Sequence, residues 1–155
     1  GHQRYAMNMK KIFDIKIEQS DDIELKGTSE GDLLVSVNSG GRFSGDLLNG
    51  KVMPVGCSTS YSPESGLNRI YESVLLETDD GAHIFMKIDA YLQLPQELED
   101  RFLAGEAVSA EEYYYKGSVC FNAGDSRCKW LENRVFMCDG IIEDWSSLRF
   151  SVYEV

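Results

Sequence analysis

One carboxylate stands among aliphatic side chains in the segment RIYESVLLETDDGAHIFMK, which runs from Arg69 to Lys87. The segment has the pattern of a β-hairpin, and alternation along its first strand places Glu72 on one face with Ile70, Val74 and Leu76. A carboxyl group in apolar surroundings either finds a hydrogen-bond donor or has its pKa raised by desolvation. With a raised pKa, Glu72 could act as a general acid or base near neutral pH.

The loop of this hairpin decides what surrounds Glu72. A two-residue turn at Asp80-Gly81 would place Glu72 opposite Asp89, whereas a three-residue loop, Asp79 to Gly81, would place it opposite Ile88. The third residue of the longer loop adopts a left-handed conformation, which glycine permits. Because register follows the face that can be buried, and the longer loop unites the two apolar faces, it predicts an inward-facing Glu72.

Two interpretations of Glu72 stay open at this point. In the first, Glu72 is a catalytic acid or base, assisted by Tyr71, Lys87 or Tyr115. In the second, it lies near the mouth of a barrel and is bonded to Arg69, a tyrosine or water. Ion-pair networks perturb pKa values as active sites do, so a shifted pKa fits both interpretations.

Further candidates for ligand binding are aromatic. In YYYK (Tyr113–Lys116), alternation puts Tyr113 and Tyr115 on one face, where tyrosines lining a cavity would supply an apolar body and a hydroxyl. The alternative is that they pack the core and bond the backbone at the rim. Trp130 and Arg134 could offer a stacking plane and an anion contact, or form a capped barrel end with a surface ion pair.

The sequence lacks the residues that several kinds of chemistry require. No C-x-x-C pair occurs, and His83 is the one histidine outside the N-terminal segment, so no metal or cofactor is predicted. With His83 on the outward face of its strand, no serine or cysteine has an evident base. The glycine-rich GGRFSG (Gly40–Gly45) lacks the phosphate-loop pattern, and its glycines indicate a bulge or a barrel corner instead.

The elements that must position these residues are mostly strands, because the apolar pattern has a period of two. One short helix is predicted over Pro95–Ala104, which opens with proline and ends before glycine. The pattern favours a mainly β, single-domain antiparallel barrel of about seven to nine strands. A β-sandwich is the alternative. The predicted strands are Ile12–Glu18, Leu33–Val37, Arg69–Thr78, Ala82–Leu92, Tyr113–Phe121, Asn133–Cys138 and Leu148–Val155, with another pair flanking Asn49-Gly50.

The length and net charge of the chain limit the partners and the number of domains that it can have. The 155 residues carry 26 acids against 15 bases and a formal net charge of −11, which argues against nucleic-acid and anionic-membrane partners. No stretch is long and apolar enough to span a membrane, and unpaired thiols suit the cytoplasm. Residues 1–8 are predicted to be a remnant left by recombinant expression or a disordered N-terminus, and residues 9–155 one domain.

The order and spacing of several sequence blocks resemble the domain-of-unknown-function 3237 family of small bacterial and fungal proteins. The blocks are GGRFSGDLLNGKVMPVG (Gly40–Gly56), LETDDGAHIFMK (Leu76–Lys87), FLAGEAVSAEEYYYKG (Phe102–Gly117), SRCKWLENRVF (Ser126–Phe136) and VYEV (Val152–Val155). The resemblance implies a compact antiparallel β-barrel and brings no established reaction, cofactor or catalytic residue. This chain departs from the family at GCSTSY (Gly56–Tyr61), near Tyr71 and Lys87, and at Glu72, where the family more often has a small residue.

Together these features predict a barrel that binds a small apolar or amphipathic molecule. Acid/base chemistry of the isomerase, cyclase or lyase kind would centre on Glu72, and the ligand would contact Tyr71, Lys87, Tyr115 and Trp130. One alternative is a non-catalytic ligand carrier. Another is a fully packed barrel that works through homo-oligomerisation at an edge strand. The residues leave open whether the protein is an enzyme.

Overall fold

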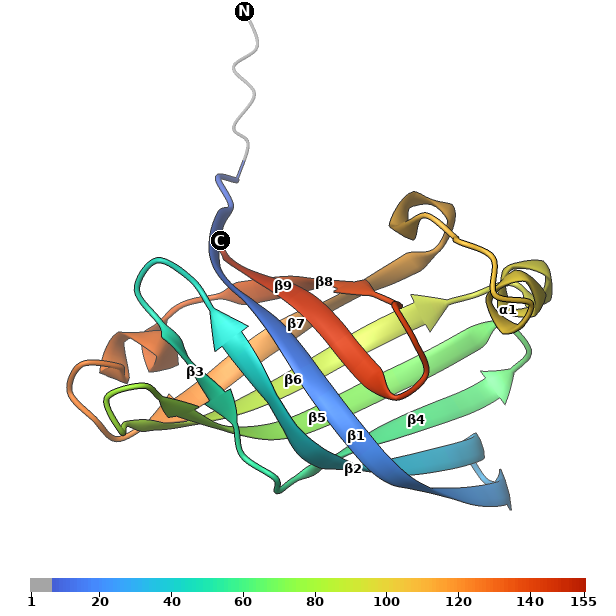
Figure 1. The fold of residues 1–155 in the computed structure, drawn as a ribbon, viewed down its shortest axis with the longest axis horizontal. Helices are drawn as coiled ribbons and strands as arrows, with labels where there is room; N and C mark the ends of the chain where they lie inside the picture. The colour runs from blue at the N-terminus through green and yellow to red at the C-terminus, as the bar shows by residue number, and fades with distance from the viewer. Residues whose placement is uncertain (1–6) are drawn as a thin grey trace, which may run out of the picture.

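Strands make up most of the protein (Figure 1), and those such as Leu67–Thr78 and His83–Gln93 alternate buried side chains with more exposed ones. The computed structural model describes residues 7–155, so the prediction for residues 1–8 falls largely outside the described residues. Within the described part, nine strands form one antiparallel sheet. They are β1 (Lys10–Thr28), β2 (Gly31–Ser44), β3 (Asn49–Val52), β4 (Cys57–Glu64), β5 (Leu67–Thr78), β6 (His83–Gln93), β7 (Tyr114–Ala123), β8 (Phe136–Ile141) and β9 (Ser147–Glu154).

The sheet closes on itself, which confirms the predicted barrel over the sandwich. β1 pairs with both β9 and β2, and β2 is joined to β5 through β3 along one part of its length and β4 along another. A closed ring satisfies the backbone groups that an open sheet leaves at its edges. The register of β1 and β2 shifts beside Gly40, where Gly40 and Gly41 have positive φ angles. The predicted bulge at this glycine pair is thereby confirmed.

The β5–β6 hairpin has the three-residue loop. The amide of Thr78 donates to the carbonyl of Ala82 at 2.8 Å, and Gly81 has a φ angle of 91°. Glu72 therefore stands opposite Ile88. This register turns Glu72 and its aliphatic neighbours on the same face of β5 into the barrel, as the sequence predicts.

One end of the barrel is filled by aromatic side chains, and we call it the packed end. Phe13 lies 5.4 Å from Phe43 and 6.2 Å from Phe121, and Phe121 lies 4.9 Å from Phe136, measured between ring centroids. The 3-10 helix η2 (Lys129–Asn133) caps this end. The predicted strand over Asn133–Cys138 therefore begins later, at Phe136, because the residues before it turn into this cap.

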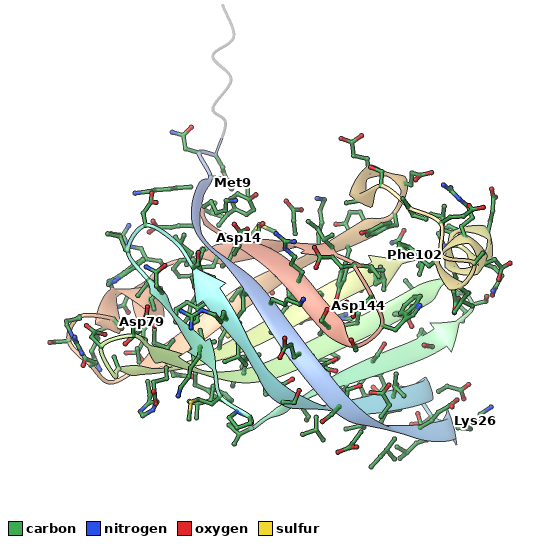
Figure 2. The ribbon with its side chains drawn as sticks, viewed as in Figure 1. Met9, Asp14, Lys26, Asp79, Phe102 and Asp144 are labelled. Atoms are coloured by element: carbon green, nitrogen blue, oxygen red, sulfur yellow. The ribbon has the colours of Figure 1, made fainter. Side chains whose placement is uncertain are left out.

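We call the opposite end the hollow end, because fewer side chains fill it. Around it lie α1 (Gln96–Leu103), the 3-10 helix η1 (Ala110–Glu112), the β8–β9 connection and the tip of the β1–β2 hairpin. Figure 2 labels Phe102 and Lys26 at this end and Asp79 at the packed end. α1 confirms the predicted helix, with Pro95 preceding it and Ala104 following it. Neither α1 nor any other helix within residues 7–155 has the length and apolar character needed to cross a membrane.

Candidate functional site

Glu72 lies inside the barrel on β5, with only 1% of its surface exposed. Ser58 on β4 is its cross-strand partner, and the Ser58 hydroxyl hydrogen-bonds the carboxyl group. The Gln19 amide on β1 donates to Oε2 of Glu72 at 3.4 Å and to the Ser58 hydroxyl at 2.9 Å. Side chains from β1 and from the consecutive strands β4 and β5 thus meet at one carboxyl group.

Asn38 fixes the orientation of the Gln19 amide. The Asn38 Nδ2 donates to the carbonyl oxygens of Ser73 at 2.9 Å and Val55 at 3.3 Å, and carbonyl oxygens only accept hydrogen bonds. The Oδ1 of Asn38 must therefore face Gln19, at 3.2 Å, and that position requires a donor. Gln19 consequently directs its NH2 group, and not its oxygen, toward Glu72.

Burial raises the pKa of Glu72 from its ordinary value to about 8, while the hydrogen bonds from Ser58 and Gln19 act in the lowering direction. At neutral pH the carboxyl group is therefore mostly protonated. Of the three acceptors near the two hydrogens of the Gln19 amide, Oε2 of Glu72 is the most distant, at 3.4 Å against 2.9 Å for the Ser58 hydroxyl and 3.2 Å for Asn38 Oδ1. Across the described residues, Oε1 has no hydrogen-bond partner in the protein. Glu72 thus has one oxygen in contact with Gln19 and one without a partner in the described part of the chain.

Tyr115 on β7 is the second buried group with an unengaged polar atom. Its side chain is 3% exposed, and its hydroxyl has no hydrogen-bond partner among residues 7–155. Burial, and next the charge of Glu72, raise the pKa of Tyr115 well above its ordinary value. Its ring packs edge-on against Phe150, with 5.2 Å between centroids. A Cβ atom at Gly140 would overlap three carbon atoms of this ring, so glycine at that position is what lets the tyrosine lie there.

A cavity of about 550 Å³ occupies the hollow end, and Tyr115, Gln19 and Ser58 all line it. Glu72 does not line the cavity itself, but it contacts Gln19 and is the cross-strand partner of Ser58, which both do. One wall is polar and comes from β2, β4 and β5, where it includes Ser36, Ser58, Ser60, Ser62 and Asn68. The rest of the lining is mainly apolar and includes Leu92, Leu94, Ile141, Ile142 and Leu148. Such a hollow, with few convergent polar groups on an apolar ground, is typical of small-molecule sites.

The structure brings Glu72 and Tyr115 together but places Tyr71 and Lys87 on the outer face of the barrel. Tyr71 is 40% exposed and packs near Arg69, whose guanidinium carbon is 5.1 Å from the ring centroid. Lys87 is exposed as well. Alternate side chains of a strand face opposite sides of the sheet, so neither residue reaches the interior beside Glu72. The hypothesis that these two assist Glu72 is therefore wrong.

The second interpretation of Glu72, in which it lies near the barrel mouth and is bonded to Arg69, also needs correction. Arg69 pairs with Asp89 on the outer face, at 2.7 Å, and so is not the partner of Glu72. Glu72 also lies beneath the cavity lining and not at an open mouth, as its burial shows.

Trp130 lies far from this site, in the cap of the packed end. Its ring is 6.2 Å from Phe136, and with Arg134 it lines a second, smaller hollow of about 220 Å³. Arg134 lies 3.5 Å from the carboxylate of Glu154. This arrangement matches the second alternative for Trp130 and Arg134, a capped barrel end with a surface ion pair, and the structure does not bring Trp130 together with Glu72.

Sequence reasoning missed Gln19, Asn38 and Ser58. One signal was available, because the serines at 58, 60 and 62 recur with the period of a strand and all face the cavity. In the described residues, no three His, Cys, Asp or Glu side chains are grouped so that they could hold a metal ion.

Comparison with known proteins gives a consistent picture. The sequence model of the family described as "Protein of unknown function (DUF3237)" matches residues 7–155. A UPF0311 protein of Clostridium acetobutylicum is 27% identical over 137 residues, which are 85% of this chain and 84% of that protein.

Two solved structures share the fold. A conserved protein of unknown function from Rhodopseudomonas palustris superposes with a TM-score of 0.88 at 21% identity, over 97% of this chain and 99% of that one. A protein from Penicillium herquei, described as an enzyme, has a TM-score of 0.70 at 16% identity, over 99% and 98% of the two chains. At these identities the likeness concerns the fold alone.

Proposed function

The chain belongs to the DUF3237 family, and we propose that this member binds a small amphipathic molecule in the hollow end and carries out acid/base chemistry on it with Glu72. The observation that carries the proposal is the asymmetry of this buried carboxyl group. Gln19, which lines the cavity, contacts its Oε2 at 3.4 Å, while its Oε1 has no partner among the described residues. A carboxyl group kept for packing alone would be expected to have both oxygens satisfied.

The chemistry that suits this arrangement is a proton transfer without a covalent intermediate. Neutral Glu72 would donate its Oε1 proton to an oxygen of the substrate, and the resulting carboxylate would accept a proton from a neighbouring carbon or oxygen of the same molecule. Gln19 and Ser58 would stabilise the carboxylate between the two steps. Tyr115 would donate a hydrogen bond to negative charge that develops on the substrate. Isomerisation, cyclisation and dehydration all fit this scheme.

The barrel fold is compatible with catalysis, since the similarly folded Penicillium herquei protein is described as an enzyme. A ligand carrier is the second candidate, because a neutral carboxyl and a phenol could equally serve as two fixed donors to a bound molecule. The remaining alternative, a barrel filled completely by its own side chains, disagrees with the presence of a cavity of about 550 Å³.

The first test is a carboxyl-resolved NMR titration of Glu72. We expect a pKa of about 8 for Glu72, and a pKa below the ordinary range for Glu77, whose carboxylate is hydrogen-bonded by His83. Glu77 serves as the internal control. A Glu72 pKa near the unperturbed ~4.3 would remove the basis for acid/base catalysis.

The second test separates the enzyme from the carrier. Metabolites that raise the melting temperature would be incubated with the wild type and with Glu72→Gln, and product formation followed by NMR. An enzyme would convert the ligand and lose conversion in the variant while still binding. If both proteins return the ligand unchanged, the carrier is favoured.

A further inference from the structure

Five carboxylates surround the opening of the cavity, and we call them the acidic rim. They are Asp22, Asp32, Glu64, Glu99 and Asp144. They come from four separate places in the chain: the β1–β2 hairpin, the end of β4, α1 and the β8–β9 connection. The residues that line the cavity include no lysine, arginine or histidine.

Many acidic groups of the described surface hold basic side chains, whereas those of the acidic rim do not, a property they share with exposed carboxylates such as Glu97 and Glu111. Arg101, for example, binds Glu106 at 3.0 Å and Glu112 at 2.9 Å. No rim carboxylate forms an ion pair with any residue in the range 7–155. Asp22 accepts only from the Ser36 hydroxyl at 2.7 Å, and Asp32 from the Gly27 amide at 2.9 Å.

The interior below the rim independently indicates a ligand. Glu72 Oε1 and the Tyr115 hydroxyl are buried polar atoms without a partner in the described protein, and Tyr115 lines the cavity. Between them and the rim, the apolar wall offers a surface for a hydrocarbon or aromatic body. At the rim, Trp145 is 53% exposed and its ring could stack against a cation.

We propose that the cavity takes a small cationic amphiphile, with an apolar body and a hydrogen-bonding group directed inward and a protonated amine held at the acidic rim. This inference rests on the proposed function and names the class of its ligand. Unpaired carboxylates around a low-dielectric hollow attract a cation and repel an anion. Since the ionic atmosphere screens charges beyond ~8 Å at physiological salt, the preference should weaken as salt is raised.

The test uses three probes that share a phenol ring and a two-carbon arm. Tyramine carries a cation on the arm, 4-ethylphenol carries no charge, and 3-(4-hydroxyphenyl)propionate carries an anion. Dissociation constants would be measured from the shifts of the Tyr115 and Trp145 NMR signals at low and high salt. We expect tyramine to bind most tightly and the anion most weakly.

A double variant, Glu64→Gln/Glu99→Gln, then tests the rim itself. Neither side chain makes a hydrogen bond or ion pair with a described residue, so folding should be unaffected. We expect tyramine to bind roughly three- to tenfold more weakly, which is the effect of losing two partly screened charges, and 4-ethylphenol to bind as before. Glu97→Gln/Glu111→Gln removes the same charge outside the cavity lining and should leave all three affinities unchanged.

Equal binding of tyramine and 4-ethylphenol, or tighter binding of the anion, overturns the cationic class. So does the absence of any tyramine-induced shift at ~10 mM, a concentration above the weak end of specific affinities. The proposed function is judged separately, because the pKa of Glu72 is measured without ligand. A normal cationic preference with an ordinary Glu72 pKa would leave a carrier, whereas a raised pKa without the preference would leave acid/base chemistry on a neutral molecule.

Discussion

The two ends of the barrel are built from the same strands, but one has a filled interior and the other a hollow one. At the packed end, rings such as Phe43 and Phe136 fill the interior and leave almost no exposed surface. At the hollow end, serines replace large side chains on β4, and Glu72 and Tyr115 remain with unengaged polar atoms. Stability favours the first arrangement, since a buried polar atom without a partner costs free energy. The difference therefore separates the part that stabilises the barrel from the part available for binding.

The largest expected change in stability that tests this difference between the two ends is that of Glu72→Gln. The folded pKa of Glu72, about 8, lies above its ordinary value of 4.5, so the folded state holds the proton more tightly than the unfolded state. Its stabilising contribution is complete below pH 4.5 and is lost as the pH rises toward 8. Since glutamine does not titrate, the variant should match the wild type near pH 4.5 and exceed it by about 5 kcal/mol above pH 8.

Urea unfolding of both proteins at several pH values measures this difference. Glu97→Gln, which changes an exposed carboxylate on α1, is the control and should show no such divergence. Parallel stability curves for wild type and Glu72→Gln would mean that the carboxyl group is not desolvated.

The second effect concerns the packed end. Phe43 is fully buried and packs against Phe13, so Phe43→Ala should lower the free energy of unfolding by about 3–5 kcal/mol. Ile70 lines the cavity at the hollow end, where space already exists. Ile70→Ala should therefore lower the free energy of unfolding by only about 2 kcal/mol. Urea unfolding at pH 6 compares them. Equal losses would show that the hollow end is as tightly packed as the other.

A third, smaller effect concerns the strand that supports Tyr115. Gly140→Ala places a methyl group against the Tyr115 ring and should cost about 1–3 kcal/mol while displacing the hydroxyl. Gly124→Ala is the matched control, because a Cβ atom there meets no atom within 4 Å. Tyr115 ring signals in NMR spectra should shift only in the first variant. An unperturbed ring would show that Gly140 does not position it.

The smallest effect compares two tyrosine hydroxyls. The Tyr113 hydroxyl accepts a hydrogen bond from the Ile142 amide at 2.9 Å, so Tyr113→Phe should cost about 1 kcal/mol. The Tyr115 hydroxyl has no partner in the described protein, so Tyr115→Phe should leave stability unchanged or slightly raised. Thermal unfolding measures both. A stability loss in Tyr115→Phe would reveal a structural role for the hydroxyl and weaken its assignment to a ligand.

Local patterns in the sequence were sufficient for much of the architecture. Period-two alternation predicted the strands of the hairpin, and glycine at position 81 predicted the loop that turns Glu72 inward. The same alternation should have excluded Tyr71 and Lys87 from the interior once that register was chosen. β4 was missed because its inward side chains are serines, so the apolar pattern that marks a strand is absent.

The sequence by itself determined which way Glu72 points, because side-chain direction along a strand depends only on alternation and on the neighbouring turn. Only the tertiary structure decided what the carboxyl group meets. Gln19 reaches it from β1 and is itself held by Asn38 of β2, while Tyr115 of β7 lies close enough for the charge of Glu72 to raise its pKa. Barrel closure depends on pairings between strands far apart in the chain, and no local spacing encodes them. The protonation of Glu72 follows from this burial, so its chemistry is a property of the closed barrel.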